Sequence, residues 1–230
     1  MKKLWQKALK VLIWLYKPLT VVILLYVVVF GLLNDVPRLP ILNETIRNVY
    51  FHVPLWFGMI SVMTMSAWFA FKYLRTNQLD FDIQSSEYAN TGLVFGLLGY
   101  ITGAIWGNYA WGDPLPKDPK ILSAAAGMLI YLAYWLLRGS IADEQRKARI
   151  SAIYNIFAFA VFIPLIFILP RLTDSLHPGN GGNPAFGSYD MDNHMRMIFY
   201  PSVIGFTLLG IWISTLRIRL RRIQLINQED

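Results

Sequence analysis

The chain of 230 residues contains no cysteine and only three histidines. The absence of cysteine excludes disulfides, thiolate metal sites and a thiol nucleophile within this chain, so any thiol chemistry must belong to a partner. Acidic residues are also few, 14 against 21 lysines and arginines, which gives a formal net charge of +7. The basic residues lie at the ends of apolar segments and do not alternate with aromatic residues, so we do not expect nucleic acid as a partner.

Two catalytic signatures are also missing from the sequence. No phosphate-binding G-x-x-x-x-G-K-[ST] motif occurs, so the chain is not expected to hydrolyse ATP by itself. No set of nucleophile, base and orienting group is recognisable either. We therefore expect a protein that binds and transfers a ligand, and not an enzyme.

Apolar residues, in contrast, are abundant. They make up 55% of the chain, aromatic residues make up 15%, and the mean hydropathy is +0.42, which is typical of an integral membrane protein. A membrane-spanning helix needs roughly 20 apolar residues. Six segments approach that length and predict a single all-α domain of six transmembrane helices, at approximately residues 12–33, 53–71, 91–111, 121–137, 150–170 and 197–216.

The first segment has two unusual features. The N-terminal sequence MKKLWQKALK runs into an apolar stretch without a small-residue cleavage site, so we expect it to be retained as the first span. Lys17 and Pro18 lie early in this segment. We therefore expect its beginning to form an amphipathic interfacial helix, with residues 19–33 as the part that crosses the membrane.

The distribution of lysine and arginine predicts the orientation of the six helices. Most of these residues fall on the side of the two termini, namely Lys2, Lys3, Lys7, Lys10, Lys72, Arg75, Arg138, Arg146, Lys147, Arg149, Arg217, Arg219, Arg221 and Arg222. The opposite side has only Arg38, Arg47, Lys117, Lys120, Arg171 and Arg196. We therefore expect both termini in the cytoplasm and the loops at 34–51, 112–120 and 171–196 on the outer face.

An aromatic stretch, TGAIWGNYAWGDPLPKDPK at residues 102–120, ends the third apolar segment on the outer side. Trp106, Tyr109 and Trp111 close the predicted helix, because the glycine and prolines that follow cannot continue it. One interpretation is an interfacial belt, since indole and phenol rings favour the boundary between lipid and water. The other is an aromatic platform for a flat apolar ligand.

All three histidines, His52, His177 and His194, fall on this same outer side. Neutral imidazoles are good iron ligands, so the placement is compatible with a haem site beside the aromatic stretch. The alternative for each of them is a solvated or hydrogen-bonded histidine without a ligand role.

The order of these features resembles the cytochrome c maturation protein C family, also called heme exporter protein C, within a wider haem-handling group that has a tryptophan-rich outer loop. The resemblance covers nearly the whole chain and includes IRNVYFHVP before the second span, the tryptophan loop after the third and DSLHPG between the fifth and sixth. It implies that His52 and His177 are the axial ligands of the haem iron. His194 is the alternative ligand, but it lacks the family context.

The loop of that family follows Trp-Gly-x-x-Trp-x-Trp-Asp. Aligned with residues 111–118, this chain keeps the first, second and last positions as Trp111, Gly112 and Asp118. Leu115 and Lys117 replace the other two tryptophans. The resemblance implies that the kept residues contact haem.

A second alignment of the loop begins at Trp106 and Gly107, ends at Asp113 and also keeps three positions. We prefer the first alignment because it leaves Trp106 inside the helix and gives Asp118, Pro119 and Lys120 as the exit of the loop. Haem is a flat, largely apolar plate with two carboxylates, so we expect apolar contacts along one edge and cations at the propionates. The expected apolar contacts are Trp106, Tyr109, Trp111 and Leu115, and the candidate cations are Lys117, Lys120, Arg47 and Arg171.

The resemblance also implies a function and partners. The chain would be a multi-pass protein of the bacterial inner (cytoplasmic) membrane, surrounded by membrane lipid, with its haem site facing the periplasm. It would hold non-covalent, b-type haem in transit and deliver it to a periplasmic haem chaperone for assembly of c-type cytochromes. The implied partners are that chaperone, ABC-type ATPase and membrane subunits, and a small single-span membrane protein.

Two other classes of function remain open at this point. The first is a membrane transporter subunit for a small solute, which should carry ionisable residues within its spans, whereas the predicted spans have almost none apart from Lys17. The second is a cofactor-free membrane scaffold for an assembly complex, whose outer aromatic residues dock a protein.

Overall fold

A computed structural model describes residues 2–113, 115–177 and 190–229. These residues form long helices and contain no strand. The helices are α1 (Lys2–Leu33), α2 (Val49–Thr76), α3 (Leu79–Trp111), α4 (Pro119–Gly139), α5 (Glu144–Phe167) and α6 (Asn193–Glu229), with short 3-10 helices η1 (Asn43–Asn48) and η2 (Leu169–Arg171). Six helices are long and apolar enough to cross a membrane, so the predicted all-α fold with six spans is confirmed.

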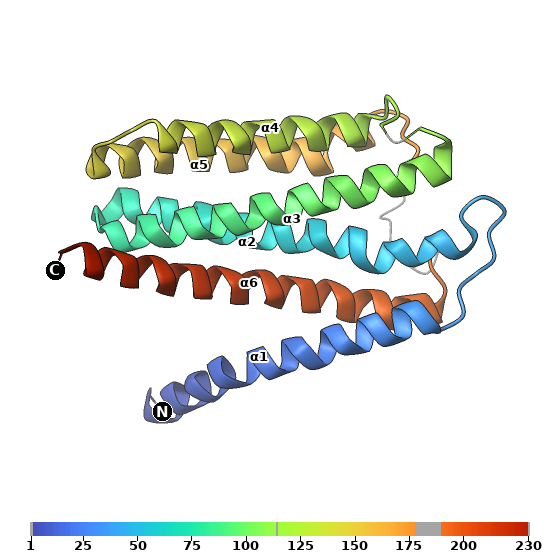
Figure 1. Cartoon of the computed structure of the whole chain (residues 1–230), viewed down its shortest axis with the longest axis horizontal. Helices are drawn as coiled ribbons and strands as arrows, with labels where there is room; N and C mark the ends of the chain where they lie inside the picture. The colour runs from blue at the N-terminus through green and yellow to red at the C-terminus, as the bar shows by residue number, and fades with distance from the viewer. Residues whose placement is uncertain (1, 114, 178–189, 230) are drawn as a thin grey trace.

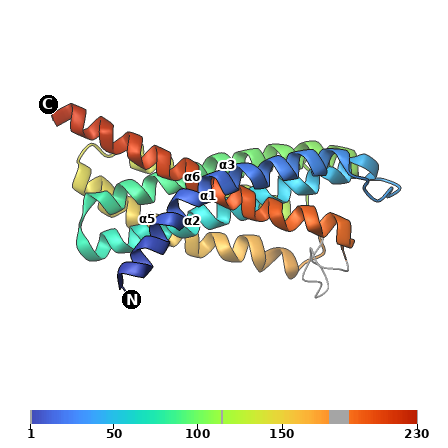
Figure 2. The same ribbon diagram turned by 90° about the horizontal axis from the view of Figure 1, so that it is seen from below.

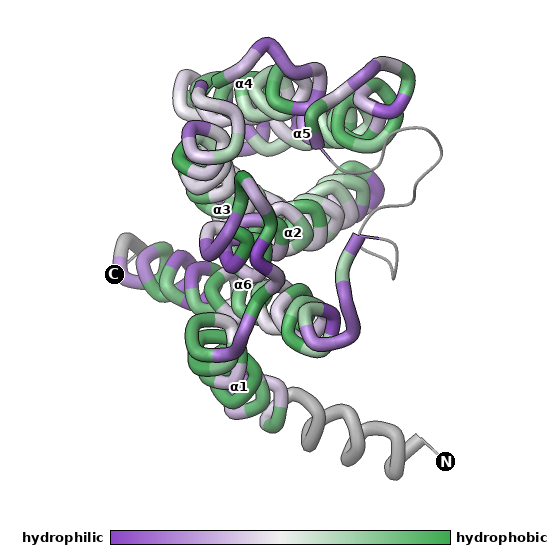
Figure 3. The backbone as a smooth tube through the Cα atoms, turned by 90° about the vertical axis from the view of Figure 1, so that its right-hand side faces the viewer, coloured by the Kyte–Doolittle hydropathy of each residue, from purple (hydrophilic) through white to green (hydrophobic). Residues whose placement is uncertain are grey.

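The helices form three rows when viewed along the bundle from the end opposite the termini (Figure 3). α4 and α5 form one outer row, α3 and α2 the middle row, and α6 and α1 the other outer row (Figures 1 and 3). Both termini lie at the same end of the bundle, together with the α2–α3 and α4–α5 connections (Figure 1). The six helices therefore run alternately up and down. Which end faces the cytoplasm remains a prediction from the charge distribution.

The helices extend beyond the apolar segments that predicted them. α2 and α3 are separated only by Asn77 and Gln78, and Asn77 turns the chain with φ of 55°. The polar first turns of α3 remain helical because three carboxylates pair with arginines of other helices. These pairs are Asp82 with Arg138 at 2.6 Å, Glu87 with Arg217 at 2.7 Å and Asp80 with Arg222 at 2.6 Å. The hydrophobicity of the sequence predicts only the part of a helix that faces lipid. Ion pairs allow the helix to continue into the polar residues beyond that part.

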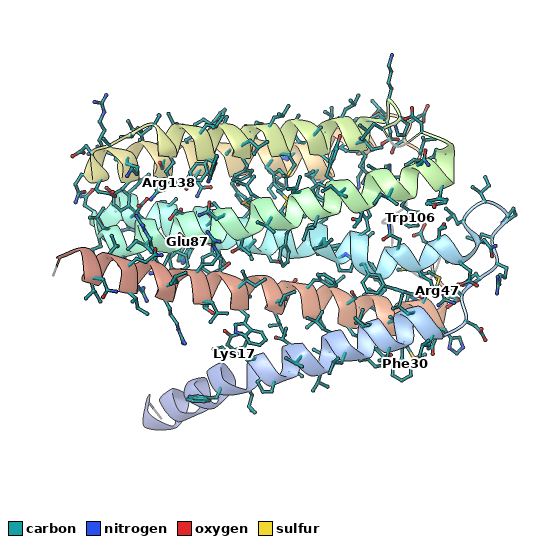
Figure 4. All side chains as sticks on the ribbon, viewed as in Figure 1. Lys17, Phe30, Arg47, Glu87, Trp106 and Arg138 are labelled. Carbon is teal, nitrogen blue, oxygen red and sulfur yellow. The ribbon has the colours of Figure 1, made fainter. Side chains whose placement is uncertain are left out.

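These ion pairs lie at the end of the bundle that carries the termini, where Figure 4 shows Arg138 and Glu87. Arg138 donates two hydrogen bonds to Asp82, at 2.8 and 2.6 Å, and thereby joins α4 to α3. The outer row is thus fastened to the middle row at this end. Trp106 lies toward the opposite end of the bundle (Figure 4).

α1 is one continuous helix through Pro18, so the chain does not break between the expected interfacial part and the part expected to cross the membrane. Proline lacks the main-chain N–H that would bond the carbonyl four residues earlier, but helices in membranes tolerate it. The Thr20 hydroxyl donates to the Tyr16 carbonyl at 2.7 Å, and the Lys17 ammonium lies 5.9 Å from the ring centre of Trp212 on α6. Figure 2 shows α1 crossing α6 at an angle.

Packing between α2 and α3 depends on glycines of α3. Four glycines spaced three or four residues apart each lie against a large side chain of α2, in the pairs Gly103 with His52, Gly99 with Trp56, Gly96 with Met59 and Gly92 with Met63. A Cβ atom at any of these glycines would lie 2.6 to 3.0 Å from its α2 neighbour, closer than ordinary contact. Small residues at helical spacing let two membrane helices approach closely. The glycines therefore fix which α2 side chains face α3.

Candidate haem-binding site

A cavity of about 360 Å³ lies at the end of the bundle opposite the termini. It is enclosed by the start of α2, the end of α3, the start of α4, the end of α5 and residues 175–177. Its lining is mainly aromatic and aliphatic, with a small number of polar groups, as is usual for ligand sites. The polar and aromatic lining includes His52, Trp56, Tyr100, Trp106, Trp111, Lys120, Arg171 and His177.

His52 reaches the cavity from the first turn of α2. Its Nδ1 lies 3.1 Å from the hydroxyl oxygen of Thr102 on α3. Its ring fits against Gly103, where a Cβ atom would lie only 2.6 Å from His52 Cε1. The rings of Trp56 and Trp106 approach it edge-on, with centroids 6.5 and 6.0 Å away. Packing on several sides therefore fixes the orientation of this imidazole.

His177 reaches the cavity from the segment after η2. Its Nδ1 lies 3.1 Å from Oδ1 of Asp118, and its ring centroid lies 4.9 Å from that of Trp111. Oδ2 of Asp118 accepts a hydrogen bond from the main-chain N–H of Leu176 at 2.6 Å. One carboxylate thus holds both the backbone and the imidazole of this segment.

The same Asp118 begins α4. It is the N-cap residue, and its Oδ1 accepts hydrogen bonds from the main-chain N–H groups of Lys120 at 2.9 Å and Ile121 at 3.3 Å. Pro119 occupies the first helical position, where its missing N–H costs nothing. Asp118 is only 2% exposed. The start of α4 and the position of His177 are therefore set by one buried side chain.

The electrostatics of this pair favour a neutral imidazole beside a charged carboxylate. Burial alone would raise the pKa of Asp118, but hydrogen bonds from Leu176 and Ser175 and the proximity of His177 outweigh it, so this pKa lies below its ordinary value. Burial lowers the pKa of His177, and the Asp118 carboxylate only partly offsets that effect. A neutral ring that donates Nδ1–H to a carboxylate keeps its Nε2 lone pair for a metal.

The predicted loop residues occupy distinct positions around the cavity. Trp106 and Trp111 line it, and the indole N–H of Trp106 donates to the Thr45 hydroxyl at 3.3 Å. Gly112 ends α3 in the left-handed region, with φ of 72°, a conformation that other residues rarely adopt. Leu115 also lines the cavity. Trp111 and Asp118 both contact His177, so the structure brings together the residues of the preferred alignment.

Three other residues considered for the site are not among the described residues that line the cavity. Tyr109 is 66% exposed and does not line the cavity, because it lies on a different face of α3 from Gly103 and Trp106. His194, the alternative ligand, is exposed and also lies outside the lining. Asp113, the last residue of the second alignment, is exposed and accepts a hydrogen bond from the Leu115 N–H at 2.9 Å.

The four candidate cations separate into two groups. Lys120 and Arg171 line the cavity, whereas Lys117 is exposed and does not. Arg47 is also outside the lining, since its guanidinium pairs with Glu44 at 2.7 Å. The same guanidinium donates to main-chain carbonyl groups at the end of α1. Arg47 therefore fastens η1 to α1, and Lys120 and Arg171 are the two candidate cations that line the cavity.

Sequence reasoning missed Trp56, Tyr100 and Thr102. Trp56 and Tyr100 lie within apolar segments, where hydropathy gives no sign of which face they occupy. A usable signal was present in the glycines at 92, 96, 99, 103 and 107, whose spacing marks one face of α3. Side chains of α2 that fit this face, spaced like His52 and Trp56, could have been predicted to line the same region.

Comparisons with known proteins agree with this picture. The family model described as "Heme exporter protein C" matches residues 2–229. The protein named Heme exporter protein C from Rhodobacter capsulatus is 26% identical over 200 residues, which cover 82% of this chain and 79% of that protein. Its namesake from Bradyrhizobium diazoefficiens is 26% identical over 195 residues, covering 80% and 72%. A cytochrome c biogenesis protein CcsA from Thermosynechococcus vestitus is 40% identical over 72 residues, covering 30% and 23%.

Proposed function

Since the chain belongs to the heme exporter protein C family, we propose that it holds one haem at the outer end of its bundle, between His52 and His177. A haem-handling role in cytochrome c maturation, as a multi-pass membrane protein, follows from the family and the six spans. The proposal adds the ligands, the face of the membrane and the direction of transfer. Haem would be non-covalently bound and passed to a periplasmic haem chaperone.

One observation carries the proposal: two histidines, 125 positions apart in the sequence, line the same cavity, with Nδ1 of each 3.1 Å from a side-chain oxygen that can accept a hydrogen bond. Thr102 takes this role for one ring and Asp118 for the other. In such an arrangement each neutral ring keeps its Nε2 lone pair. The remaining lining is apolar and aromatic, which suits the porphyrin plate.

The residues present fit haem in shape and in charge. The cavity of about 360 Å³ is open, so it would bury one edge of the plate and leave the other edge outside. Bound haem supplies an iron with two axial positions. The Trp56, Trp106 and Trp111 side chains would exclude water from the buried edge, and Arg171 and Lys120 lie where propionates could be neutralised.

Non-covalent binding is supported by the composition. A thioether attachment requires cysteine, as in the C-x-x-C-H motif of c-type cytochromes. The chain has none, so no such bond can form to it. The haem would accordingly be b-type and transferable, which suits a protein that passes it on and performs no catalysis.

The outward-facing site is supported by the distribution of charge. The cavity lies at the end of the bundle with few basic residues, and the termini lie at the end rich in them. In a bacterium this would place the site in the periplasm and the termini in the cytoplasm. ABC-type subunits and a small single-span protein would complete the assembly, as the family resemblance implies.

Introduced cysteines test the orientation directly, because the chain has no other cysteine. The exposed Lys117 lies beside the cavity, and the exposed Thr76 lies at the opposite end of the bundle. Lys117→Cys should react with a membrane-impermeant maleimide in intact cells, and Thr76→Cys only after lysis. The reverse pattern would overturn the proposed orientation.

Transfer of haem tests the function. The full chain would be co-expressed with the haem chaperone and the ABC-type subunits, and haem on the purified chaperone would be measured by absorption. The double variant His52→Ala, His177→Ala should deliver at most a few per cent of the wild-type amount, while His194→Ala should deliver as much as wild type. Equal delivery by the double variant and wild type would refute the proposal.

A further inference from the structure

The hydroxyl of Thr102 lies between its own helix and His52. It is 2.8 Å from the carbonyl oxygen of Leu98 and 3.0 Å from that of Gly99, one turn earlier on α3. It is also 3.1 Å from His52 Nδ1. A threonine hydroxyl has one proton and two acceptor lone pairs. Its proton is used on the main-chain carbonyls, so toward His52 the oxygen acts as an acceptor.

This assignment determines the protonation state of the ring. An acceptor beside Nδ1 requires that Nδ1 carry the proton, and in the neutral ring Nε2 then keeps its lone pair. With a hydrophobic neighbour in place of the hydroxyl, the ring would lose this contact that favours the Nδ1-protonated tautomer. The hydroxyl therefore selects the form of His52 that can bind a metal through Nε2.

Contacts between α2 and α3 keep the two groups together. Asn48, the last residue of η1, lies one turn before His52, and its Nδ2 donates to the Thr102 carbonyl oxygen at 3.3 Å. Gly103 provides the space for the imidazole, and Trp106 closes it from the outer side. Thr102 is thus contacted twice, at its main-chain carbonyl by Asn48 and at its hydroxyl by His52.

We propose that Thr102 is a positioning residue for His52, which holds the imidazole in its Nδ1-protonated form with Nε2 available to haem iron. The metal-binding part of this statement rests on the proposed function, whereas the selection of the tautomer does not. The two ligands would then differ in their support, since His177 is held by the Asp118 carboxylate and His52 by a neutral hydroxyl. Groups that orient a metal-binding histidine commonly change metal affinity about 10- to 100-fold when they are lost.

The tautomer can be measured without haem. The haem-free full-length protein would be labelled with ¹⁵N-histidine, and the ring signals assigned with His52→Gln, since the chain has only three histidines. Wild-type His52 should show a protonated Nδ1 and an unprotonated Nε2. Thr102→Val keeps the branched shape and removes the hydroxyl, so it should move the ring toward the Nε2-protonated form. Thr102→Ser should restore the wild-type form.

Thr91→Val provides the matched control. Thr91 is a buried threonine on the same helix, and its hydroxyl donates to the Glu87 carbonyl at 3.0 Å, a similar bond within the helix. It lies far along α3 from His52 and should leave the tautomer unchanged. In haem-loaded protein, Thr102→Val should lower haem retention about 10- to 100-fold, and Thr102→Ser and Thr91→Val should not.

A protonated Nε2 in wild-type His52 would overturn the inference without any variant. So would an unchanged tautomer in Thr102→Val. If the tautomer follows the prediction but His52→Ala retains haem like wild type, the positioning of His52 stands and the proposed ligand is wrong. A lower haem retention in Thr102→Val with an unchanged tautomer would assign a merely structural role to Thr102 and also overturn the inference.

Discussion

Replacement of Gly103 by alanine should disturb the proposed site. The added Cβ atom would lie 2.6 Å from His52 Cε1, whereas ordinary contact begins near 3.4 Å. The imidazole must therefore retreat by about 0.8 Å, and positioned ligands tolerate only about 0.5 Å. Trp56 and Trp106 pack against the ring and limit its movement.

The expected losses of stability and of haem retention follow from the kind of clash. Adding a methyl group to a packed interior costs about 1–3 kcal/mol of unfolding free energy. A shift of a metal ligand away from its partner should lower haem retention about 10- to 100-fold. Both effects can be measured on purified full-length protein, by thermal unfolding in detergent and by haem absorbance per protein.

Gly139→Ala is the control for this prediction. Gly139 is the last residue of α4, and a Cβ atom there would contact nothing within 4 Å. Its replacement should leave haem retention unchanged and alter stability by at most about 1 kcal/mol. If Gly103→Ala retained haem and melted like Gly139→Ala, the close packing of His52 against α3 would be wrong.

Three further substitutions separate the parts of the site. Asp118→Asn keeps an N-cap acceptor but leaves either the Leu176 N–H or His177 without a carboxylate oxygen, so haem retention should fall about 10-fold; Asp118→Ala also removes the cap and should lose about 1 kcal/mol more of stability than Asp118→Asn. Wild-type haem retention in Asp118→Asn would contradict the proposed role of the carboxylate. Trp111→Leu removes the ring contact with His177, worth about 0.5–1.5 kcal/mol, and should weaken haem retention severalfold. Tyr109→Leu alters an exposed ring outside the cavity and should leave haem retention unchanged, and equal effects of the two variants would argue for a general interfacial belt. Asp82→Ala leaves the buried Arg138 charge without its carboxylate and should cost about 3–5 kcal/mol of unfolding free energy. The haem bound per folded protein should not change, because this pair lies at the opposite end of the bundle from the cavity, and a selective loss of haem would show that the two ends are coupled.

The spans and the family could be predicted from the sequence because both depend on features that the order of residues displays. Long apolar segments mark helices that face lipid, and the motifs around His52 and His177 are contiguous. The match over residues 2–229 confirms the family. The helix ends were not predictable in the same way, because the polar start of α3 is helical through ion pairs with residues far away in the sequence, such as Arg138 and Arg222.

The direction of individual side chains was the harder part of the site. Tyr109 was grouped with Trp106 and Trp111 because all three are close in sequence. At about 100° per residue it lies about 120° away from Gly103, outside the face that lines the cavity. Its charge alone makes Arg47 a candidate partner for a haem propionate. In the structure its guanidinium instead pairs with Glu44 and donates hydrogen bonds to carbonyl groups that only the folded chain brings near. Neither the exposed position of Tyr109 nor the pairing of Arg47 follows from composition.

The coordination of bound haem tests the central claim most directly. Electron paramagnetic resonance and absorption spectra would be recorded on haem-loaded wild type and on the single variants His52→Ala, His177→Ala and His194→Ala. Wild type and His194→Ala should show low-spin iron with two histidine ligands, and each of the other two variants should lose that signature. An unchanged low-spin spectrum in either His52→Ala or His177→Ala would contradict the account.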